Sequence, residues 1–197
     1  HENAAEQLSV RVGRTEREIA ALEELSGLLG LSKTPEYIEC YDISNLASSD
    51  MVGGMVVMDN GRFAKKYYKM FNIKSVSEQD DYASMREVLY RRFKEYLSPD
   101  CTDEGFKRLP DLIFLDGGKG HVDAVKPLLE ELKIDVPLFG LVKDDRHHTR
   151  AVISSGGEEI QIAKSRTVFS LLTKLQDEVH RYTITFQTSE RSAHIRE

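Results

Sequence analysis

Between positions 111 and 120 the chain reads DLIFLDGGKG. The apolar run at residues 111–115 predicts a buried strand, and the glycines after it allow a tight turn into a helix predicted over residues 121–132. A second apolar run at residues 137–142 predicts another strand. Because parallel strands need a crossover such as a helix between them, this order favours two parallel strands in one sheet.

Three further strands are predicted on the N-terminal side of this unit, at residues 37–42, 51–58 and 62–71. The last two are joined by Asp59-Asn60-Gly61, and such a turn is a strong hairpin signal because glycine adopts positive φ readily. We therefore expect these strands to form an antiparallel meander. A helix is predicted next, over residues 81–97.

The two ends of the chain are predicted to be helical. Good helix formers with leucines at helical spacing fill residues 3–30 and predict one or two lead-in helices. After the parallel unit we expect a charged loop at residues 143–150, a small hairpin at 151–162 and a final helix from 166 to about 186. The chain is accordingly divided into three parts: a helical lead-in at residues 1–34, a main domain at 35–190 and a polar tail at 191–197.

The composition is that of one globular domain, with 197 residues of which 40% are hydrophobic and 30% charged. No apolar run approaches the roughly 20 residues of a membrane span, so we expect a cytoplasmic protein without membrane contact. Cys40 and Cys101 have neither metal-ligand nor redox-motif spacing. The net charge of -6 argues mildly against DNA binding, but a metal site would invert the local sign of part of this charge.

Two acidic residues follow predicted strands at what should be the same rim of the sheet. Asp42 and Asp116 each come directly after an apolar run. Hard cations such as Mg²⁺ take oxygen ligands and often only one or two protein carboxylates, which leaves positions for water and phosphate. The alternatives are an exposed strand-end residue for Asp42 and a helix cap for Asp116. Our leading hypothesis is metal-assisted hydrolysis of a phosphodiester.

Three further residues are candidates for this rim. Asp81 and its neighbour Asp80 begin a predicted helix, where aspartate is also favoured simply as a cap. His180 flanks the apolar stripe of the final helix together with Gln176, so its ring can face the carboxylates; an ordinary surface histidine is the alternative. Lys119 follows the glycines and could meet a phosphate, although the pattern of a P-loop is absent.

Six stretches of the chain resemble, in family order, the C-terminal endonuclease domain of UvrC, the nuclease of bacterial nucleotide excision repair. They are residues 38–44 (IECYDIS), 55–57 (MVV), 80–87 (DDYASMRE), 110–121 (PDLIFLDGGKGH), 140–147 (GLVKDDRH) and 176–181 (QDEVHR). The resemblance implies an α/β fold of the ribonuclease H type. Its mixed sheet would combine the antiparallel meander with the parallel strands, flanked by helices, behind an N-terminal lead-in helix.

The same resemblance implies an Asp-Asp-His centre at Asp42, Asp116 and His180, with Asp81 as a further catalytic residue and Mg²⁺ or Mn²⁺ as the cofactor. Whether His180 is a metal ligand or shuttles a proton stays open, as does the number of ions. The implied reaction cuts the damaged strand of double-stranded DNA on the 5′ side of a lesion. The implied partner is the UvrB–DNA complex, formed after UvrA has acted, and further modules of the family are expected outside this chain.

The candidates for contacts to DNA phosphates are Lys119, Lys143, Arg146 and Arg181, which would position the strand without reading its sequence. Two rival interpretations are kept. One is a non-catalytic ribonuclease H-like module that docks DNA and UvrB, and the other is a doubly wound phosphotransfer enzyme that uses the turn after Asp116. The complete Asp-Asp-His set disfavours the first, and the antiparallel first half disfavours the second.

Overall fold

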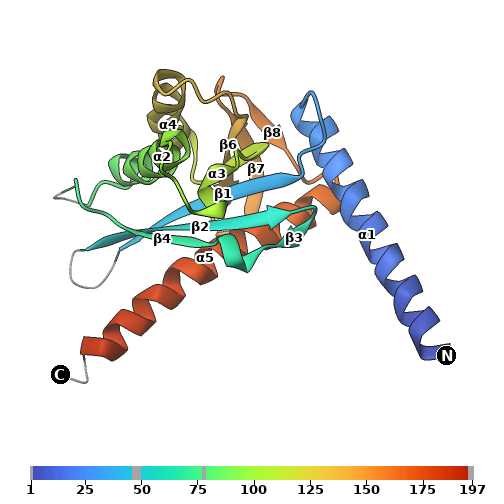
Figure 1. The fold of residues 1–197 in the computed structure, drawn as a ribbon. Coiled ribbons are helices and arrows are strands. Elements are labelled where there is room, and N and C mark those ends of the chain that lie inside the picture. The colour runs from blue at the N-terminus through green and yellow to red at the C-terminus, as the bar shows by residue number, and fades with distance from the viewer. Residues whose placement is uncertain (1, 46–49, 77–78, 195–197) are drawn as a thin grey trace.

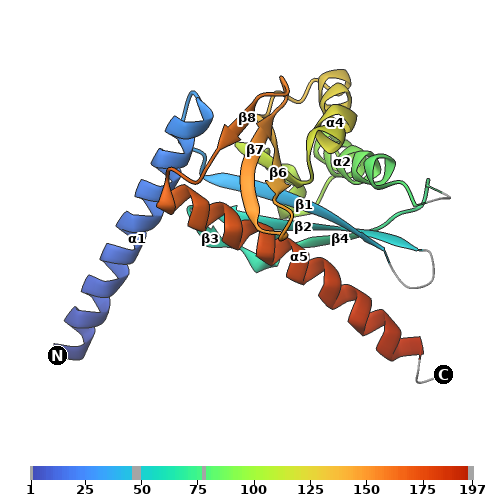
Figure 2. The same ribbon diagram turned by 180° about the vertical axis from the view of Figure 1, so that it is seen from behind.

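The computed structural model describes residues 2–45, 50–76 and 79–194 and contains a mixed, eight-stranded sheet with helices on both faces (Figures 1 and 2). Its elements are α1 (Glu2–Leu29), β1 (Tyr37–Asn45), β2 (Met51–Asp59), β3 (Arg62–Phe63), the 3₁₀ helix η1 (Lys65–Tyr67), β4 (Lys69–Asn72), α2 (Asp81–Leu97), α3 (Glu104–Lys107), β5 (Leu112–Asp116), α4 (Lys119–Glu131), β6 (Leu138–Lys143), β7 (Thr149–Ser154), β8 (Glu159–Gln161) and α5 (Arg166–His194). None of the helices within these described ranges has the length and apolar character to cross a membrane.

The strand order is β3-β2-β1-β5-β6-β7-β8, with β4 paired to β2. The strands β1, β5 and β6 are parallel to one another, whereas β2 and β7 pair with them in the antiparallel sense. This combination of an antiparallel meander and parallel strands confirms the predicted ribonuclease H-like fold class. The parallel centre is the part that matters for function, because adjacent parallel strands end at the same rim.

Each face of the sheet packs on its own pair of helices. Alternate residues of a strand point to opposite faces, so Tyr37 and Tyr41 belong to the core beneath α2 and α4, while Ile38 and Cys40 belong to the core beneath α1 and α5. Figures 1 and 2 show α2 and α4 on one side of the sheet and α5 on the other. Asp42 is the next residue after Ile38 and Cys40 on the same face of β1, so its side chain faces α5.

The structure corrects the strand ends predicted from the sequence. β1 does not stop at residue 42 but continues to Asn45, because it stays paired with β2 through Asn45 and Met51. Asp42 thus lies inside a strand, beyond the last residue of β1 that pairs with β5. Asp116 is the last residue of β5, which runs one residue further than the predicted strand.

The strand predicted at residues 62–71 is also wrong in part, because η1 separates β3 from β4. Tyr67 packs on Tyr37, and Tyr68 packs edge-on against Tyr182 of α5. These aromatic contacts hold the backbone between the two strands out of the sheet. At the other end of the chain, α5 extends beyond the predicted end at residue 186 and includes part of the predicted tail, whereas residues 195–197 lie outside the described part.

A buried ion pair fixes α2 to β1. Arg92 of α2 and Glu39 of β1 are both 0% exposed, and the guanidinium donates to Glu39 Oε1 from Nε at 3.0 Å and from Nη2 at 2.7 Å. Arg92 Nη1 donates to the carbonyl of Phe106, and the hydroxyl of Tyr41 donates to Glu39. The charge pair therefore has the additional hydrogen bonds that a buried ion pair needs, and it sets the position of α2 relative to β1.

Replacement of Arg92 is expected to be strongly destabilising. The variant Arg92→Ala leaves Glu39 as a buried charge without its partner, which costs about 3–5 kcal/mol of the free energy of unfolding. Denaturant unfolding measures this loss. The matched control is Arg86→Ala, because Arg86 lies on the same helix and makes an exposed ion pair with Glu131, which contributes no more than about 1 kcal/mol. Equal stability of the two variants would contradict the prediction.

Candidate metal centre

The pairing of β1 with β5 brings Asp42 and Asp116 together. In this parallel pair Tyr41 lies opposite Leu115, so the next residue of each strand is one of the two aspartates. Both side chains point to the face covered by α5. Asp42 lies two residues after Cys40 and Asp116 two residues after Phe114, and alternate residues of a strand point to the same face. Neighbouring strands lie about 4.8 Å apart, so the two carboxylates are held side by side.

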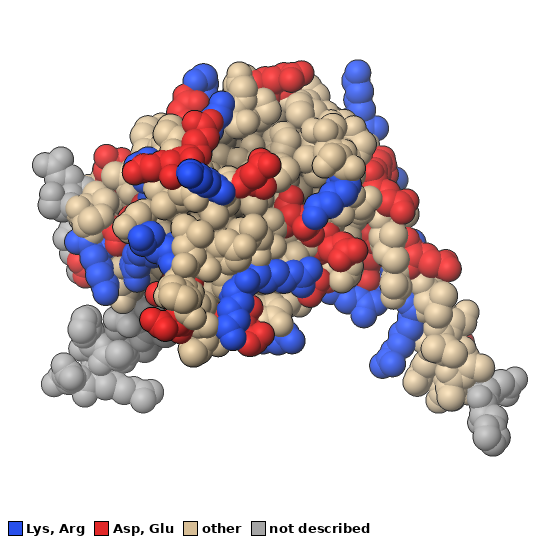
Figure 3. Space-filling model, turned by 45° about the horizontal axis from the view of Figure 1, so that its top comes forward, with Lys and Arg blue, Asp and Glu red and all other residues tan. Residues whose placement is uncertain are grey.

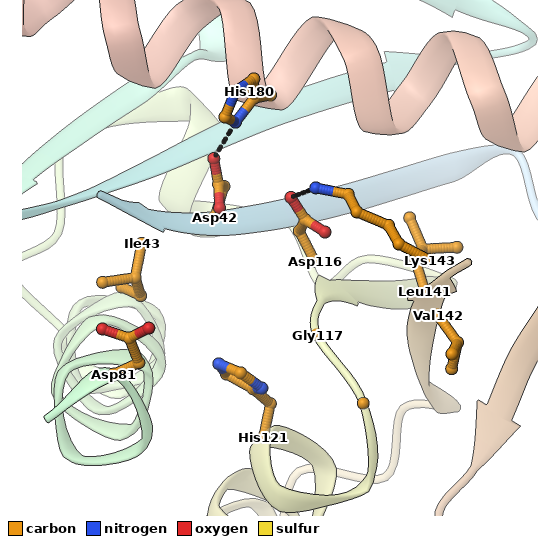
Figure 4. A pocket seen from close by; sticks show the side chains of 11 residues that line it. Asp42, Ile43, Asp81, Asp116, Gly117, His121, Leu141, Val142, Lys143 and His180 are labelled. Atoms are coloured by element: carbon orange, nitrogen blue, oxygen red, sulfur yellow. Dashed lines mark hydrogen bonds and ion pairs between the residues drawn. The ribbon is translucent and has the colours of Figure 1, made fainter. Parts of the chain in front are cut away.

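α5 adds a histidine to the pair. His180 follows the buried Val179, which packs on the sheet, and its Nδ1 lies 3.3 Å from Asp42 Oδ2 (Figure 4). One ligand atom from each of Asp42, Asp116 and His180 falls within 4.8 Å of the others, so the three residues could hold a metal ion. Two carboxylates suit Mg²⁺ and Mn²⁺, and an imidazole adds a ligand that suits Mn²⁺ better than Mg²⁺.

Asp116 has a partner on each carboxylate oxygen. Lys143 Nζ, at the end of β6, is 3.0 Å from Oδ2, and Gln176 Nε2 donates to Oδ1 at 2.7 Å. Figure 4 shows the Lys143 side chain directed at Asp116. A carboxylate has about four lone-pair sites, so these two contacts leave room for a cation.

Burial dominates the electrostatics of Asp42, which is 6% exposed. Its desolvation raises the pKa of Asp42 above the ordinary value, the hydrogen bond with His180 lowers it, and the charge of Asp116 raises it again. For His180 the hydrogen bond to Asp42 is the main cause, and it raises the pKa of the ring. The contact between the two groups favours a charged ring and a charged carboxylate, whereas the burial of Asp42 opposes the charge on the carboxylate.

A cleft of about 480 Å³ opens over these residues and has Asp81 and His121 on its far wall (Figure 4). The sequence left open whether Asp81 is a helix cap. In the structure the cap of α2 is Asp80, whose Oδ1 accepts a hydrogen bond from the backbone N–H of Ala83 at 3.0 Å. Asp81 lines the cleft instead, and its catalytic role stays a prediction.

His121 is a cleft residue to which the sequence analysis gave no role. Its ring packs edge-to-face with Tyr82, with 4.8 Å between the centroids, and burial lowers the pKa of His121. The ring lies against the backbone of Gly117, where a Cβ atom would overlap the imidazole. Gly117 is thus required because the side chain of His121 approaches its backbone closely. The only signal for His121 in the sequence was the presence of a histidine in the first turn of the predicted helix.

The residues expected to contact DNA phosphates have different positions. Among the residues that the structure describes, the cleft lining includes Lys143 but not Lys119, Arg146 or Arg181. Lys119 is paired with Asp123, and Arg181 forms two hydrogen bonds with Glu178. Only Lys143 is therefore brought to the candidate metal centre itself.

The mixed sheet and the carboxylate–imidazole group at its rim define a ribonuclease H-like domain with a candidate divalent-metal site. The sequence matches the family described as the UvrC RNAse H endonuclease domain over residues 26–184. The chain belongs to this family, as the motifs predicted.

Relatives in whole proteins support this membership. The chain is 44% identical over 171 residues to the UvrABC system protein C of Finegoldia magna, which covers 87% of this chain and 27% of the relative. It is 46% identical over 178 residues to the protein of that name from Thermoanaerobacter sp. (strain X514), with 86% of this chain and 29% of the relative covered. The chain thus spans less than a third of the length of these relatives.

Solved structures give a weaker likeness. Human ENDOV matches with a TM-score of 0.49 and 11% identity over 91% of this chain and 99% of that one. A DNA complex of Ciona intestinalis Endonuclease V matches with a TM-score of 0.41 and 15% identity over 71% of this chain and 59% of that one.

Loss of the Asp42 carboxylate is expected to lower the pKa of His180. In metal-free protein the raised pKa stabilises the folded state fully below the ordinary value of about 6.5, and this contribution is lost as the pH rises through the raised value. Asp42→Asn removes the carboxylate that raises the pKa of His180, so this pKa should fall. NMR titration of the His180 ring measures the pKa in both proteins, with His148 in an exposed loop as the internal control. The same His180 pKa in both would contradict the prediction.

Removal of the Lys143 charge is expected to strengthen metal binding. The ammonium beside Asp116 repels an incoming cation by about 1 kcal/mol in a solvent-accessible site, which is about fivefold in affinity. Calorimetric titration with Mn²⁺ of Lys143→Met should show this gain. Lys119→Met is the control, because Lys119 is paired with Asp123 away from the cleft. Weaker Mn²⁺ binding by Lys143→Met would contradict the prediction.

Proposed function

We propose that this domain is a divalent-metal-dependent DNA endonuclease that hydrolyses a phosphodiester bond of a damaged strand. The observation that carries the proposal is the convergence of Asp42, Asp116 and His180 within 4.8 Å at one rim of the sheet. The family membership supports it, because the family is described as an endonuclease domain.

The donor set indicates Mg²⁺ or Mn²⁺ as the cofactor, with Asp42 and Asp116 as the residues that hold it and His180 as a further ligand or a proton carrier. A divalent cation bound there would polarise the phosphate and lower the pKa of a bound water. His180 has its Nδ1 against Asp42, and its side chain is 54% exposed, so its other ring nitrogen is accessible to water or to a DNA oxygen. An imidazole can accept and release a proton, and the hydrogen bond to Asp42, which raises the pKa of His180, favours the protonated ring.

The remaining cleft residues have separate roles in this proposal. Lys143 neutralises Asp116 in the metal-free protein, and a cation on Asp116 would free its ammonium to contact a phosphate oxygen. Asp81 and His121, on the far wall, would orient water and the strand at a distance from the carboxylate pair. Asp81 is thus catalytic in the proposal without being one of the three metal ligands.

DNA binding by this domain is expected to be weak. On the face shown in Figure 3, basic side chains lie scattered among acidic ones and form no continuous track. The contacts proposed for Lys119, Lys143, Arg146 and Arg181 would be to phosphates, and three of these residues must exchange a present carboxylate partner for the phosphate. Such contacts position a strand, and their strength falls as salt rises.

The context proposed for the reaction comes from the relatives named UvrABC system protein C. We propose that the domain makes the 5′ incision of nucleotide excision repair in the cytoplasm, on damaged duplex DNA held in a UvrB–DNA complex after UvrA has acted. The rival function is a non-catalytic module that docks DNA and UvrB. A complete and partly buried donor set favours catalysis over docking, because a docking surface has no need of two adjacent buried carboxylates.

The proposed function predicts that Asp116→Asn abolishes metal-dependent nicking of supercoiled plasmid. Loss of a carboxylate that holds the cation removes several kcal/mol of transition-state stabilisation, so the rate should fall by about 10³-fold or more while the protein stays folded. Asp135→Asn is the control, because Asp135 is an exposed residue outside the cleft. Nicking by Asp116→Asn at nearly the wild-type rate would refute the assignment.

A further inference from the structure

We infer that Gln176, with Thr149 behind it, is a positioning residue that holds the Asp116 carboxylate in place for the cation. This inference rests on the metal site proposed above. Gln176 lies one helical turn before His180 on α5, so both side chains are on the same face of the helix. One turn of α5 therefore reaches both aspartates: Gln176 contacts Asp116, and His180 contacts Asp42.

The spacing of the helix matches the spacing of the strands. Four residues of an α-helix rise about 6 Å, and neighbouring strands are about 4.8 Å apart. Because β1 and β5 are direct neighbours, a helix that crosses them can present one side chain to each strand. His180 is partly exposed and can exchange its partner, whereas Gln176 is buried at 2% exposure.

The orientation of the Gln176 amide follows from its surroundings. A carboxylate only accepts hydrogen bonds, so the NH₂ group must face Asp116 and the amide oxygen must face the other way. There it accepts a hydrogen bond from the hydroxyl of Thr149, which is itself 4% exposed. A hydroxyl can donate or accept, so Asp116 sets the orientation of the amide, and the hydrogen bond from Thr149 to the amide oxygen holds the side chain in that orientation.

Two paired residues of β6 and β7 act on the two oxygens of Asp116, one directly and the other through Gln176 of α5. Thr149 of β7 is the register partner of Lys143 of β6. Lys143 contacts Asp116 Oδ2 directly, and Thr149 acts on Oδ1 through Gln176. The two contacts differ in charge: the ammonium competes with a cation, whereas the amide donates a hydrogen bond and leaves the negative charge of the carboxylate available. Gln176 can therefore stay in place when a cation binds.

The direct test is the Mn²⁺ affinity of Gln176→Met, a side chain of similar length that cannot donate a hydrogen bond. Loss of a hydrogen-bond partner of a metal ligand typically weakens binding about 10-fold to 100-fold, and we expect at least the lower value by calorimetry on the 197-residue chain. Nicking should recover at saturating Mn²⁺, because the cation then fixes the carboxylate. A merely structural defect would instead lower the rate at saturating Mn²⁺ as well.

Two further variants complete the test. Thr149→Val keeps the Gln176 donor but leaves the buried amide oxygen without its hydrogen bond, so the side chain is held less firmly and the Mn²⁺ affinity should fall between those of wild type and Gln176→Met. Thr173→Val makes the same chemical change on α5 at a buried hydroxyl that has no hydrogen-bond partner among the described residues, and its affinity should equal that of wild type. An affinity of Gln176→Met within twofold of wild type would overturn the inference, as would an equal loss in Thr173→Val.

The failure of this inference is distinguishable from the failure of the proposed function. If wild type binds Mn²⁺, Asp116→Asn does not, and Gln176→Met binds as wild type does, the metal site stands and the positioning role is wrong. If Asp116→Asn binds Mn²⁺ as tightly as wild type, the metal site is wrong and the positioning role falls with it.

Discussion

Two carboxylates on adjacent strands, both largely removed from water, are the constraint around which this domain is organised. The side chain of Asp42 is 8% exposed and that of Asp116 is 6% exposed, so their like charges oppose each other at short range. The protein compensates with His180 on Asp42 and with Lys143 on Asp116. Both compensating groups are more exposed than the aspartates and can move when a cation arrives. A bound cation could therefore replace Lys143 and His180 as the positive partner of the two carboxylates.

The fold supplies this arrangement through elements far apart in the sequence. The parallel register of β1 and β5 sets the distance between the carboxylates, and the alternation of the strands turns both of them towards α5. The buried ion pair of Arg92 with Glu39 ties α2 to β1, and the start of α2 then places Asp81 across the cleft. The candidate metal centre therefore depends on contacts on both faces of the sheet. One of them is the ion pair of Glu39, which lies three residues before Asp42 on β1.

The sequence predicted much of this, and the reasons for its successes and failures are physical. Local patterns are sufficient to predict the strands that carry Asp42 and Asp116 and the helix that carries His180, because the spacing of apolar residues can be seen in neighbouring positions of the sequence. The pairing of Gln176 with Asp116 and the capping of α2 by Asp80 could not be predicted, because long-range packing or a choice between adjacent residues decides them. The break between β3 and β4 also has a tertiary cause, the packing of Tyr68 on α5.

The most direct measurement of the central claim is the anomalous diffraction of a crystal of this domain soaked in Mn²⁺. The account predicts a peak at the rim of the sheet, within about 2.5 Å of a carboxylate oxygen from each of Asp42 and Asp116 and on the side of the cleft that His180 faces. A crystal saturated with Mn²⁺ that shows no peak between these carboxylates, with Lys143 still paired to Asp116, would contradict it.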